Sequence, residues 1–236
     1  MSVIILAGGH GECMRMGDDY VPKLMIPVRG KPLLEHHIEW LKASGHDSIV
    51  LCLGVKADVI RAHFSDGARW GVRLRYFVEQ SRLGTAGTVK ALGTASLPDD
   101  TLVFLGDVWA RFDCVKMLEF HRSHPGLATL ALRKPEKEDE AQMVVMGPLR
   151  RIASFPEYQS DDPAAMAAVP VWIIRRQLLH HVPGEAPSNF LKDVFPAVVR
   201  AGQELYGYPV TGEAADIGTP ERFERFSRRL AKSASV

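Results

Sequence analysis

The sequence predicts an α/β fold built on a doubly wound, mostly parallel mixed sheet. Short apolar runs alternate with helical patterns through the first half of the chain, as expected where parallel strands and helices follow one another. The second half contains closely spaced apolar runs, which indicate strands that pair antiparallel. We find no internal repeat and no Gly-, Pro- or Ser-rich linker, so one domain over residues 1–236 is predicted.

The first half of the chain is expected to supply the parallel part of the sheet. Apolar residues Leu33, Leu34, Ile38 and Leu41 recur at helical spacing, and Gly45 ends that helix. The expected elements are strands at 2–6, 47–53, 72–77 and 101–105, and helices at 32–44, 57–64 and 87–92.

The second half is less regular and is expected to supply the antiparallel strands. One helix, at 189–201, presents Phe190, Val194, Phe195 and Val198 on a single face. The expected strands are 128–132, 143–146, 152–155, 169–174 and 205–208, and a charged helix at 220–230 ends the fold.

Composition excludes several classes of function. The formal charge of the 236 residues is +1, from 29 basic and 28 acidic side chains, which gives no general attraction to nucleic acid or membranes. No signal-like segment and no apolar run of membrane-spanning length is seen. The 3 cysteines, at positions 13, 52 and 114, form no zinc or disulfide pattern. We therefore expect a cytoplasmic protein.

Segments that are distant in the sequence carry residues suited to binding phosphates or a metal ion. The first strand runs into the glycine loop 6–11, and Lys23 follows. A second small-residue loop, 83–87, leads into a helix, and Asp107 and Asp216 each follow a strand. Backbone N–H groups and a lysine can hold a triphosphate, and two carboxylates suit Mg²⁺. Ligands of open α/β sheets bind at the carboxyl ends of strands, so we expect these segments to converge.

Each segment alone also has an explanation without function. A glycine loop after a strand is often only a tight turn, and a Gly-Asp pair is often a turn or a helix cap. Thr219 would simply cap a helix that begins with Pro220. Turn chemistry does not account for all the segments occurring together in this order.

The order and spacing of these segments resemble the sugar-1-phosphate nucleotidylyltransferases, also called nucleotide-sugar pyrophosphorylases. The family opening, Leu-Ala-Gly-Gly-x-Gly-(Thr or Glu)-Arg-(Leu or Met)-Arg-Pro, is similar to residues 6–16, LAGGHGECMRM. Residues 22–34, PKLMIPVRGKPLL, follow without a gap, and LGTAG at 83–87 and DIGTP at 216–220 match later motifs. The likeness covers roughly residues 2–226 and looks nearest to bacterial single-domain members that act on muramate or heptose 1-phosphate.

The resemblance implies a Rossmann-like fold and transfer of a nucleoside monophosphate from an NTP to a sugar 1-phosphate, with release of pyrophosphate. It implies a nucleotide-binding half of about 1–125, a sugar-binding half of about 126–236 and Mg²⁺ as cofactor, and it leaves a homo-oligomer open. The implied residues are Lys23, Asp107 and Arg15 for catalysis; Asp107 and Asp216 for the metal; Leu6, Ala7, Gly8, Gly9, Gly11, Gln80, Gly84 and Thr85 for the nucleotide; and Trp109, Glu157, Val171 and Asp193 for the sugar.

The chain departs from the family pattern in ways that leave two hypotheses. Cys13 stands where the family has an arginine that steadies the leaving pyrophosphate, although Arg15 is two residues away. Tyr158 stands where a lysine grips the sugar phosphate, and Leu191 where a glutamate holds sugar hydroxyls. One hypothesis is an active transferase with an unusual acceptor. The other is a weak or inactive homologue that binds a nucleotide and regulates a partner.

Two other classes fit the sequence less well. A dinucleotide-dependent oxidoreductase is disfavoured because the first loop lacks the Gly-x-Gly-x-x-Gly register and Leu53-Gly54 ends the second strand without an acidic residue. A glycosyltransferase of related fold would not explain Pro22-Lys23 and the DIGTP motif together. The neighbouring histidines at 36 and 37 point about 100° apart on a helix, so a surface or packing role is favoured over a shared metal.

Overall fold

The computed structural model describes residues 1–8, 13–16, 19–136, 141–156, 162–184 and 187–233. Its backbone divides into two compact units. Unit 1 comprises Met1–Ile4, Leu83–Phe104 and Phe112–Gly212, and unit 2 comprises Ile5–Arg82, Leu105–Arg111 and Glu213–Val236. Over the described ranges, every helix is too short or too polar to cross a bilayer.

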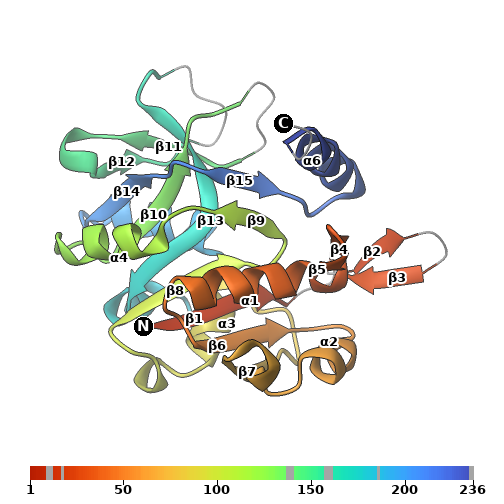
Figure 1. Ribbon diagram of the computed structural model, residues 1–236. Helices are drawn as coiled ribbons and strands as arrows, with labels where there is room; N and C mark the ends of the chain where they lie inside the picture. The colour runs from red at the N-terminus through yellow and green to blue at the C-terminus, as the bar shows by residue number, and fades with distance from the viewer. Residues whose placement is uncertain (9–12, 17–18, 137–140, 157–161, 185–186, 234–236) are drawn as a thin grey trace. The chain divides into compact units, whose positions relative to one another are not determined.

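Unit 2 carries the parallel strands of the first half, in the order β1, β6, β7 (Figure 1). Strands β6 and β7 pair in parallel, from Ser48 opposite Arg73 to Leu53 opposite Val78. The apolar run of β6 is almost entirely buried, as expected for a strand covered on both faces. The elements are β1 (Ser2–Ala7), β2 (Cys13–Met16), β3 (Asp19–Pro22), η1 (Lys23–Met25), β4 (Pro27–Val28), β5 (Lys31–Pro32), α1 (Leu33–Ala43), β6 (Ser48–Leu53), α2 (Ala57–Phe64), η2 (Ala68–Trp70), β7 (Arg73–Val78), β9 (Val108–Arg111), β15 (Glu213–Asp216) and α6 (Pro220–Ser233).

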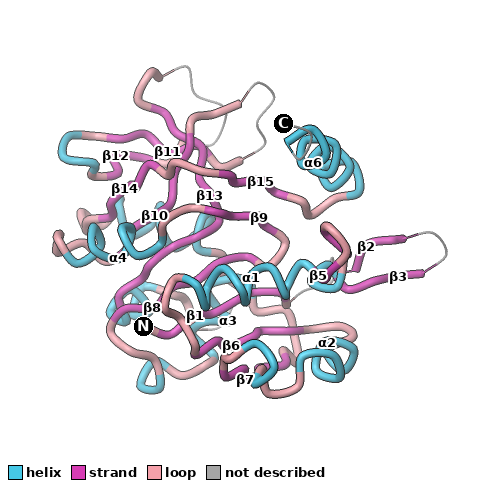
Figure 2. The backbone as a smooth tube through the Cα atoms, in the orientation of Figure 1, coloured by secondary structure: helices cyan, strands magenta, loops and turns pink. Residues whose placement is uncertain are grey.

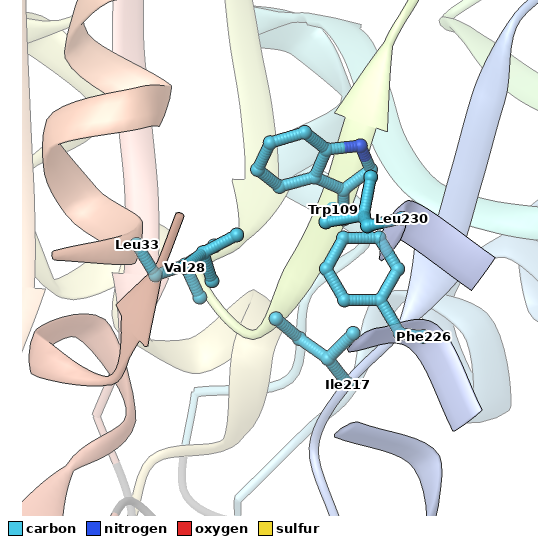
Figure 3. Packing of buried hydrophobic residues seen from close by; sticks show 6 residues of the cluster. All are labelled: Val28, Leu33, Trp109, Ile217, Phe226 and Leu230. Atoms are coloured by element: carbon cyan, nitrogen blue, oxygen red, sulfur yellow. The ribbon is translucent and has the colours of Figure 1, made fainter. Parts of the chain in front are cut away.

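A separate ladder in unit 2 joins strands from distant parts of the chain. Strand β9 pairs antiparallel with β15, with Asp216 opposite Val108. Helix α6 follows β15 and packs onto this ladder through a hydrophobic cluster that Figure 3 shows. In that cluster the rings of Trp109 and Phe226 lie 5.1 Å apart. The cluster comprises Val28, Leu33, Trp109, Ile217, Phe226 and Leu230. Burial of these side chains fixes the strand that follows Asp107 against the strand that ends at Asp216.

Unit 1 is organised around the long strand β13, as the strand assignment in Figure 2 shows. Strand β13 pairs antiparallel with β8, β10 and β11, while β10 also pairs in parallel with β14. Trp172, Phe190 and Phe195 are almost fully buried and pack together. The elements are α3 (Gly84–Ala91), η3 (Thr94–Ser96), β8 (Asp100–Leu105), α4 (Cys114–Arg122), β10 (Ala128–Arg133), β11 (Met143–Met146), η4 (Pro148–Arg150), β12 (Ile152–Ser154), β13 (Ala165–Arg175), η5 (Arg176–His181), η6 (Phe190–Val194), α5 (Phe195–Arg200) and β14 (Leu205–Pro209).

The predicted fold class is confirmed, with local differences. The mixed sheet has parallel pairing of β6 with β7 and antiparallel pairing around β13. Helix α3 begins at Gly84, three residues before its expected start. The helix expected at 189–201 is divided into a π-helical turn and α5 because Pro196 cannot donate a backbone hydrogen bond. The hairpin β2–β3 was not predicted, and the division into nucleotide- and sugar-binding halves stays a prediction.

Candidate active site

Asp107 lies in a turn between β8 and β9 that is fixed by its glycine neighbour. The N–H of Gly106 donates to the carbonyl of Leu6 at 2.8 Å. A Cβ at position 106 would lie 2.6 Å from Cδ2 of Leu24 in η1 and 3.3 Å from Cγ2 of Ile5 in β1, so a larger residue would force the buried side chain of Leu24 to move. From α1, Nε2 of His37 donates to the carbonyl of Gly106 at 2.9 Å. Burial lowers the pKa of His37 to about 3, so the ring is neutral at pH 7 and holds the backbone next to Asp107.

The pairing of β9 with β15 brings Asp216 next to Asp107. The N–H of Ile217 donates to the carbonyl of Asp107 at 3.0 Å, and the N–H of Gly218 donates to Oδ1 of Asp216 at 2.8 Å. A Cβ at position 218 would lie 2.7 Å from Oδ2 of Asp107 and 3.0 Å from Oδ1 of Asp216. Both carboxylates therefore face the small space that Gly218 leaves open. We call Asp107 and Asp216 the carboxylate pair.

Each member of the carboxylate pair contacts a cationic side chain. Nζ of Lys23 lies 3.0 Å from Oδ2 of Asp107, and Nη1 of Arg222 lies 2.5 Å from Oδ2 of Asp216. The same Cβ position at Gly218 is 3.3 Å from Nζ of Lys23. Loss of hydration raises the pKa of Asp216, the hydrogen bond from Gly218 opposes this shift, and the neighbouring Asp107 adds to it. A cation bound at this point would favour the ionised form of Asp216.

The carboxylate pair is chemically suited to supply the protein ligands of a Mg²⁺ ion. Carboxylate oxygens are hard donors, and Mg²⁺ keeps water and phosphate oxygens as its remaining ligands. In the described ranges no cluster of three or more His, Cys, Asp or Glu side chains is suited to hold a metal, so these two acids would be the protein's contribution beside substrate phosphates.

The glycine loop is described only in part. Leu6 is buried, Ala7 is half-buried and Gly8 is exposed. A Cβ at Gly8 would lie 2.0 Å from Oε1 of Glu79, so a larger residue at this position would displace the carboxylate of Glu79. Gly9 and Gly11 lie outside the described residues. Their predicted contacts with a nucleotide stay predictions.

The other residues predicted to act near the glycine loop lie on the hairpin β2–β3 or after β7. Arg15 is exposed on β2, opposite Tyr20. Cys13 is a half-buried free thiol opposite Pro22, the residue directly before Lys23. Gln80 is exposed after β7. The catalytic role of Arg15 and the nucleotide contact of Gln80 stay predictions.

The second small-residue loop, at the start of α3, is held by the segment before η6. The carbonyl of Ser188 accepts hydrogen bonds from the N–H groups of Ala86, at 2.9 Å, and Gly87, at 3.2 Å. Oδ1 of Asn189 accepts from the N–H of Thr85 at 3.3 Å, and Oγ1 of Thr85 accepts from the N–H of Phe190 at 2.9 Å. These first amides of the helix are thus already satisfied, while the hydroxyl hydrogen of Thr85 remains able to donate.

Gly84 is where this loop depends most on glycine. Its φ is +73°, and a Cβ there would lie 2.4 Å from the carbonyl oxygen of Ser188. We expect Gly84→Ala to destabilise the protein by about 3 kcal/mol, from left-handed strain and from displacement of the 188 backbone. Gly202, with a φ of +75° and no atom within 4 Å of its Cβ position, is the matched control. Gly202→Ala should cost only about 1 kcal/mol in the free energy of urea unfolding, from strain alone. Equal losses in the two variants would contradict this account.

The residues predicted to contact the sugar have varied surroundings. Trp109 is 5% exposed, and its Nε1 donates to Oε2 of Glu213 at 2.9 Å. Val171 is fully buried in β13, opposite Phe104. In unit 1, Oδ2 of Asp193 accepts from the N–H of Asn189 at 2.7 Å. Trp109 and Val171 therefore pack in the interior here, and the sugar contacts stay predictions. Glu157, with the neighbouring Tyr158, lies outside the described residues.

Sequence reasoning missed two residues that shape the site. Arg222 lies in the first turn of α6, two positions after Pro220. The helix start at Pro220 is visible in the sequence, and it places Arg222 near Asp216, with which it pairs. His37, for which either a surface or a packing role was expected, is completely buried, and its hydrogen bond to the turn before Asp107 gave no sequence signal.

Comparison with known proteins identifies the family of the chain. The chain matches the nucleotidyl transferase family over residues 2–233, and it belongs to that family. It is 31% identical to a D-glycero-alpha-D-manno-heptose 1-phosphate guanylyltransferase of Aneurinibacillus thermoaerophilus, over 98% of each chain. It is 30% identical to a mannose-1-phosphate guanylyltransferase of Mycobacterium tuberculosis, with 98% of this chain covered but only 65% of the relative's length.

Solved structures support the fold. A putative glucose-1-phosphate thymidylyltransferase from Bacillus anthracis superposes with a TM-score of 0.81 at 21% identity, covering 98% of this chain and 94% of that one. At this level of identity the likeness shows a shared fold. The fold and family predicted from the motifs are thereby confirmed.

Proposed function

We propose that this protein transfers a nucleoside monophosphate from an NTP to a sugar 1-phosphate, releasing pyrophosphate, with Mg²⁺ as cofactor. The observation that carries the proposal is the meeting of Asp107, Asp216 and Lys23 around Gly218. These residues come from segments that the family motifs contain, and two curated relatives are named for reactions of this type.

The proposed reaction is an in-line displacement at the α-phosphorus. An oxygen of the sugar phosphate forms the new P–O bond, the bond to the β-phosphate oxygen breaks, and the leaving pyrophosphate keeps that electron pair. Asp107 and Asp216 would hold Mg²⁺, which supplies charge neutralisation of phosphate oxygens. Lys23, placed by η1 at 3.0 Å from Asp107, is close enough to this point to contact the same phosphates. The chain's own contribution is therefore positioning and opposite charge.

For the substrates, we propose GTP as donor and a mannose- or heptose-type sugar 1-phosphate as acceptor. Support comes from the reactions for which the two relatives above are named, one of which has nearly the same length as this chain. Backbone contacts to the base give no sequence signal, so the donor has to be measured.

A second candidate is a nucleotide-binding homologue with little activity. Cys13, a half-buried thiol, lies opposite Pro22, the residue before Lys23. The family pattern has an arginine at position 13, so this chain lacks a positive charge close to Lys23. Loss of such a charge could lower the rate by about two to three orders of magnitude.

One experiment separates these candidates. Pyrophosphate release is measured with each of the four common NTPs and a panel of hexose and heptose 1-phosphates, with Mg²⁺ and again after chelation with EDTA. We expect turnover with GTP that chelation abolishes. Thermal unfolding in the same mixtures reports binding independently of turnover. Stabilisation by an NTP without turnover of any pair would favour the second candidate, and neither stabilisation nor turnover would contradict both.

A further inference from the structure

The ion pair between Arg222 and Asp216 occupies the place where the proposed cation would bind. Nη1 of Arg222 lies 2.5 Å from Oδ2 of Asp216, whose other oxygen accepts from Gly218. Asp107 is paired with Lys23 in the same way. The four side chains thus have no net formal charge as they stand. A divalent cation that binds the carboxylate oxygens must compete with Lys23 and Arg222 for them. If the two side chains stay in place, the site gains a net positive charge that no acidic group balances.

The backbone of Arg222 is anchored, whereas its side chain can turn. In the first turn of α6, the N–H of Arg222 donates to Oγ1 of Thr219 at 3.3 Å. Further along the helix, Phe226 and Leu230 are buried in the hydrophobic cluster of Figure 3. The side chain of Arg222 is nevertheless 25% exposed, so its guanidinium borders solvent. A fixed Cα with a long, partly exposed side chain suits a group that changes partners without movement of the helix.

An anion is the natural second partner of this guanidinium. Once a cation shares the carboxylate pair, the local formal charge becomes strongly positive, and a triphosphate brings compensating oxygens to the same point. A guanidinium binds phosphate oxygens through two parallel hydrogen bonds, which an ammonium cannot do. The hairpin offers no charge for this purpose at Cys13, which lies opposite the residue before Lys23.

We propose that Arg222 is a phosphate-binding residue that exchanges partners, from Asp216 in the free protein to an oxygen of the bound triphosphate when the cation occupies the carboxylate pair. This inference rests on the proposed function and adds to it a residue that supplies the guanidinium absent from position 13. It assigns opposite effects to one side chain: Arg222 competes with the cation alone and cooperates with the cation–triphosphate complex.

The test measures these two affinities separately. Binding of Mn²⁺ alone, followed by electron paramagnetic resonance, and binding of GTP with Mg²⁺, followed by calorimetry, are compared for the wild type, Arg222→Met and Arg222→Lys. For Arg222→Met we expect Mn²⁺ alone to bind about 3- to 10-fold more tightly, because a competing cation is gone. We expect GTP with Mg²⁺ to bind about 10- to 30-fold more weakly, because a charge-assisted contact is lost. Arg222→Lys should fall between these values for the triphosphate.

Arg225→Met, an exposed change on the same helix, is the matched control and should alter neither affinity. A merely structural role for Arg222 would weaken both affinities together, and that result would overturn the inference. Unchanged affinities in Arg222→Met, with wild type binding the triphosphate, would also overturn it while leaving the proposed function intact. If the wild type bound no triphosphate with any cation, the proposed function would fail and the inference with it.

Discussion

Replacement of Asp107 by asparagine is expected to lower the rate of nucleotidyl transfer on the order of 10³-fold or more. Oδ2 of Asp107 is both the partner of Lys23 and half of the carboxylate pair. Asparagine has the same shape but no charge, so it cannot neutralise a cation and leaves Lys23 without its partner. The loss should appear in kcat at saturating substrate, because the interaction concerns the reacting phosphates.

The fold should tolerate this change, which makes the rate informative. The turn is held through the backbone, by Gly106 with Leu6, by His37 with Gly106 and by Ile217 with the carbonyl of Asp107. We therefore expect the free energy of urea unfolding to change by less than about 1 kcal/mol. Asp58→Asn, an exposed change in the first turn of α2, is the control and should leave the rate as it is. A rate for Asp107→Asn within tenfold of wild type would contradict the assignment of the carboxylate pair.

The sequence predicted the pieces of this site better than it predicted how they meet. Asp107 and Asp216 were expected at strand ends because glycine, proline and threonine beside them mark turns and a helix start. The pairing of β9 with β15 is what joins them, and both strands are short. Pairing between distant short strands depends on burial in the tertiary structure, which periodicity within one segment does not encode.

The remaining differences have similar physical causes. The hairpin of Cys13–Met16 with Asp19–Pro22 was not predicted, since four residues per strand give too few positions to show alternation. His37 contacts Gly106, which is 69 residues away in the chain, and Arg222 pairs with Asp216 across the turn between β15 and α6, so neither contact follows from periodicity within one segment. By contrast, α2 was predicted at its observed bounds, because its apolar spacing is local.

Acid is expected to destabilise the protein steeply between pH 6.5 and pH 4, because unit 1 buries two histidines in a continuous hydrogen-bonded chain. The N–H of Gly126 donates to Nδ1 of His124 at 3.2 Å, so the ring proton is on Nε2, which donates to Oγ1 of Thr129 at 2.8 Å. Nε2 of His121 faces the carboxylate of Asp100 at 3.5 Å, which favours the proton on that nitrogen, so the hydroxyl of Thr129 donates to Nδ1 of His121, also at 2.8 Å. Each ring therefore uses one nitrogen as an acceptor, which protonation would abolish.

Burial sets the direction of the pKa shifts of His121 and His124, and the surrounding charges modify them. His121 faces Asp100 at 3.5 Å, whereas Arg175 donates to the carbonyls of His121 and His124, and Glu204 lies near His124 through Tyr206. Burial lowers the pKa of His121 to about 4, against the opposing effect of Asp100. Burial and Arg175 likewise lower the pKa of His124 to about 4.

The direction in which stability changes with pH follows from the number of protons that each state binds. Below pH 6.5 the unfolded chain protonates both histidines, while the folded protein does so only near pH 4, so the unfolded state binds more protons in this range. Stability is complete above pH 6.5 and is lost as the pH falls toward 4. Each histidine contributes about 3 kcal/mol to that loss, and with both titrating the slope approaches about 2.7 kcal/mol per pH unit.

Substitution of both rings should flatten this profile. In His121→Asn, the amide oxygen can accept from Thr129 as Nδ1 does, and in His124→Gln the amide nitrogen can donate to Thr129 as Nε2 does. The double variant should be less stable than wild type at pH 7 but should lose much less stability on acidification. The control is the double variant His180→Asn with His181→Gln, which alters two exposed neighbours in η5 and should keep the wild-type slope. Urea unfolding at half-unit steps from pH 7 to pH 4 measures all three proteins. Equal slopes in all of them would show that carboxylates elsewhere, rather than the chain through Thr129, govern acid unfolding.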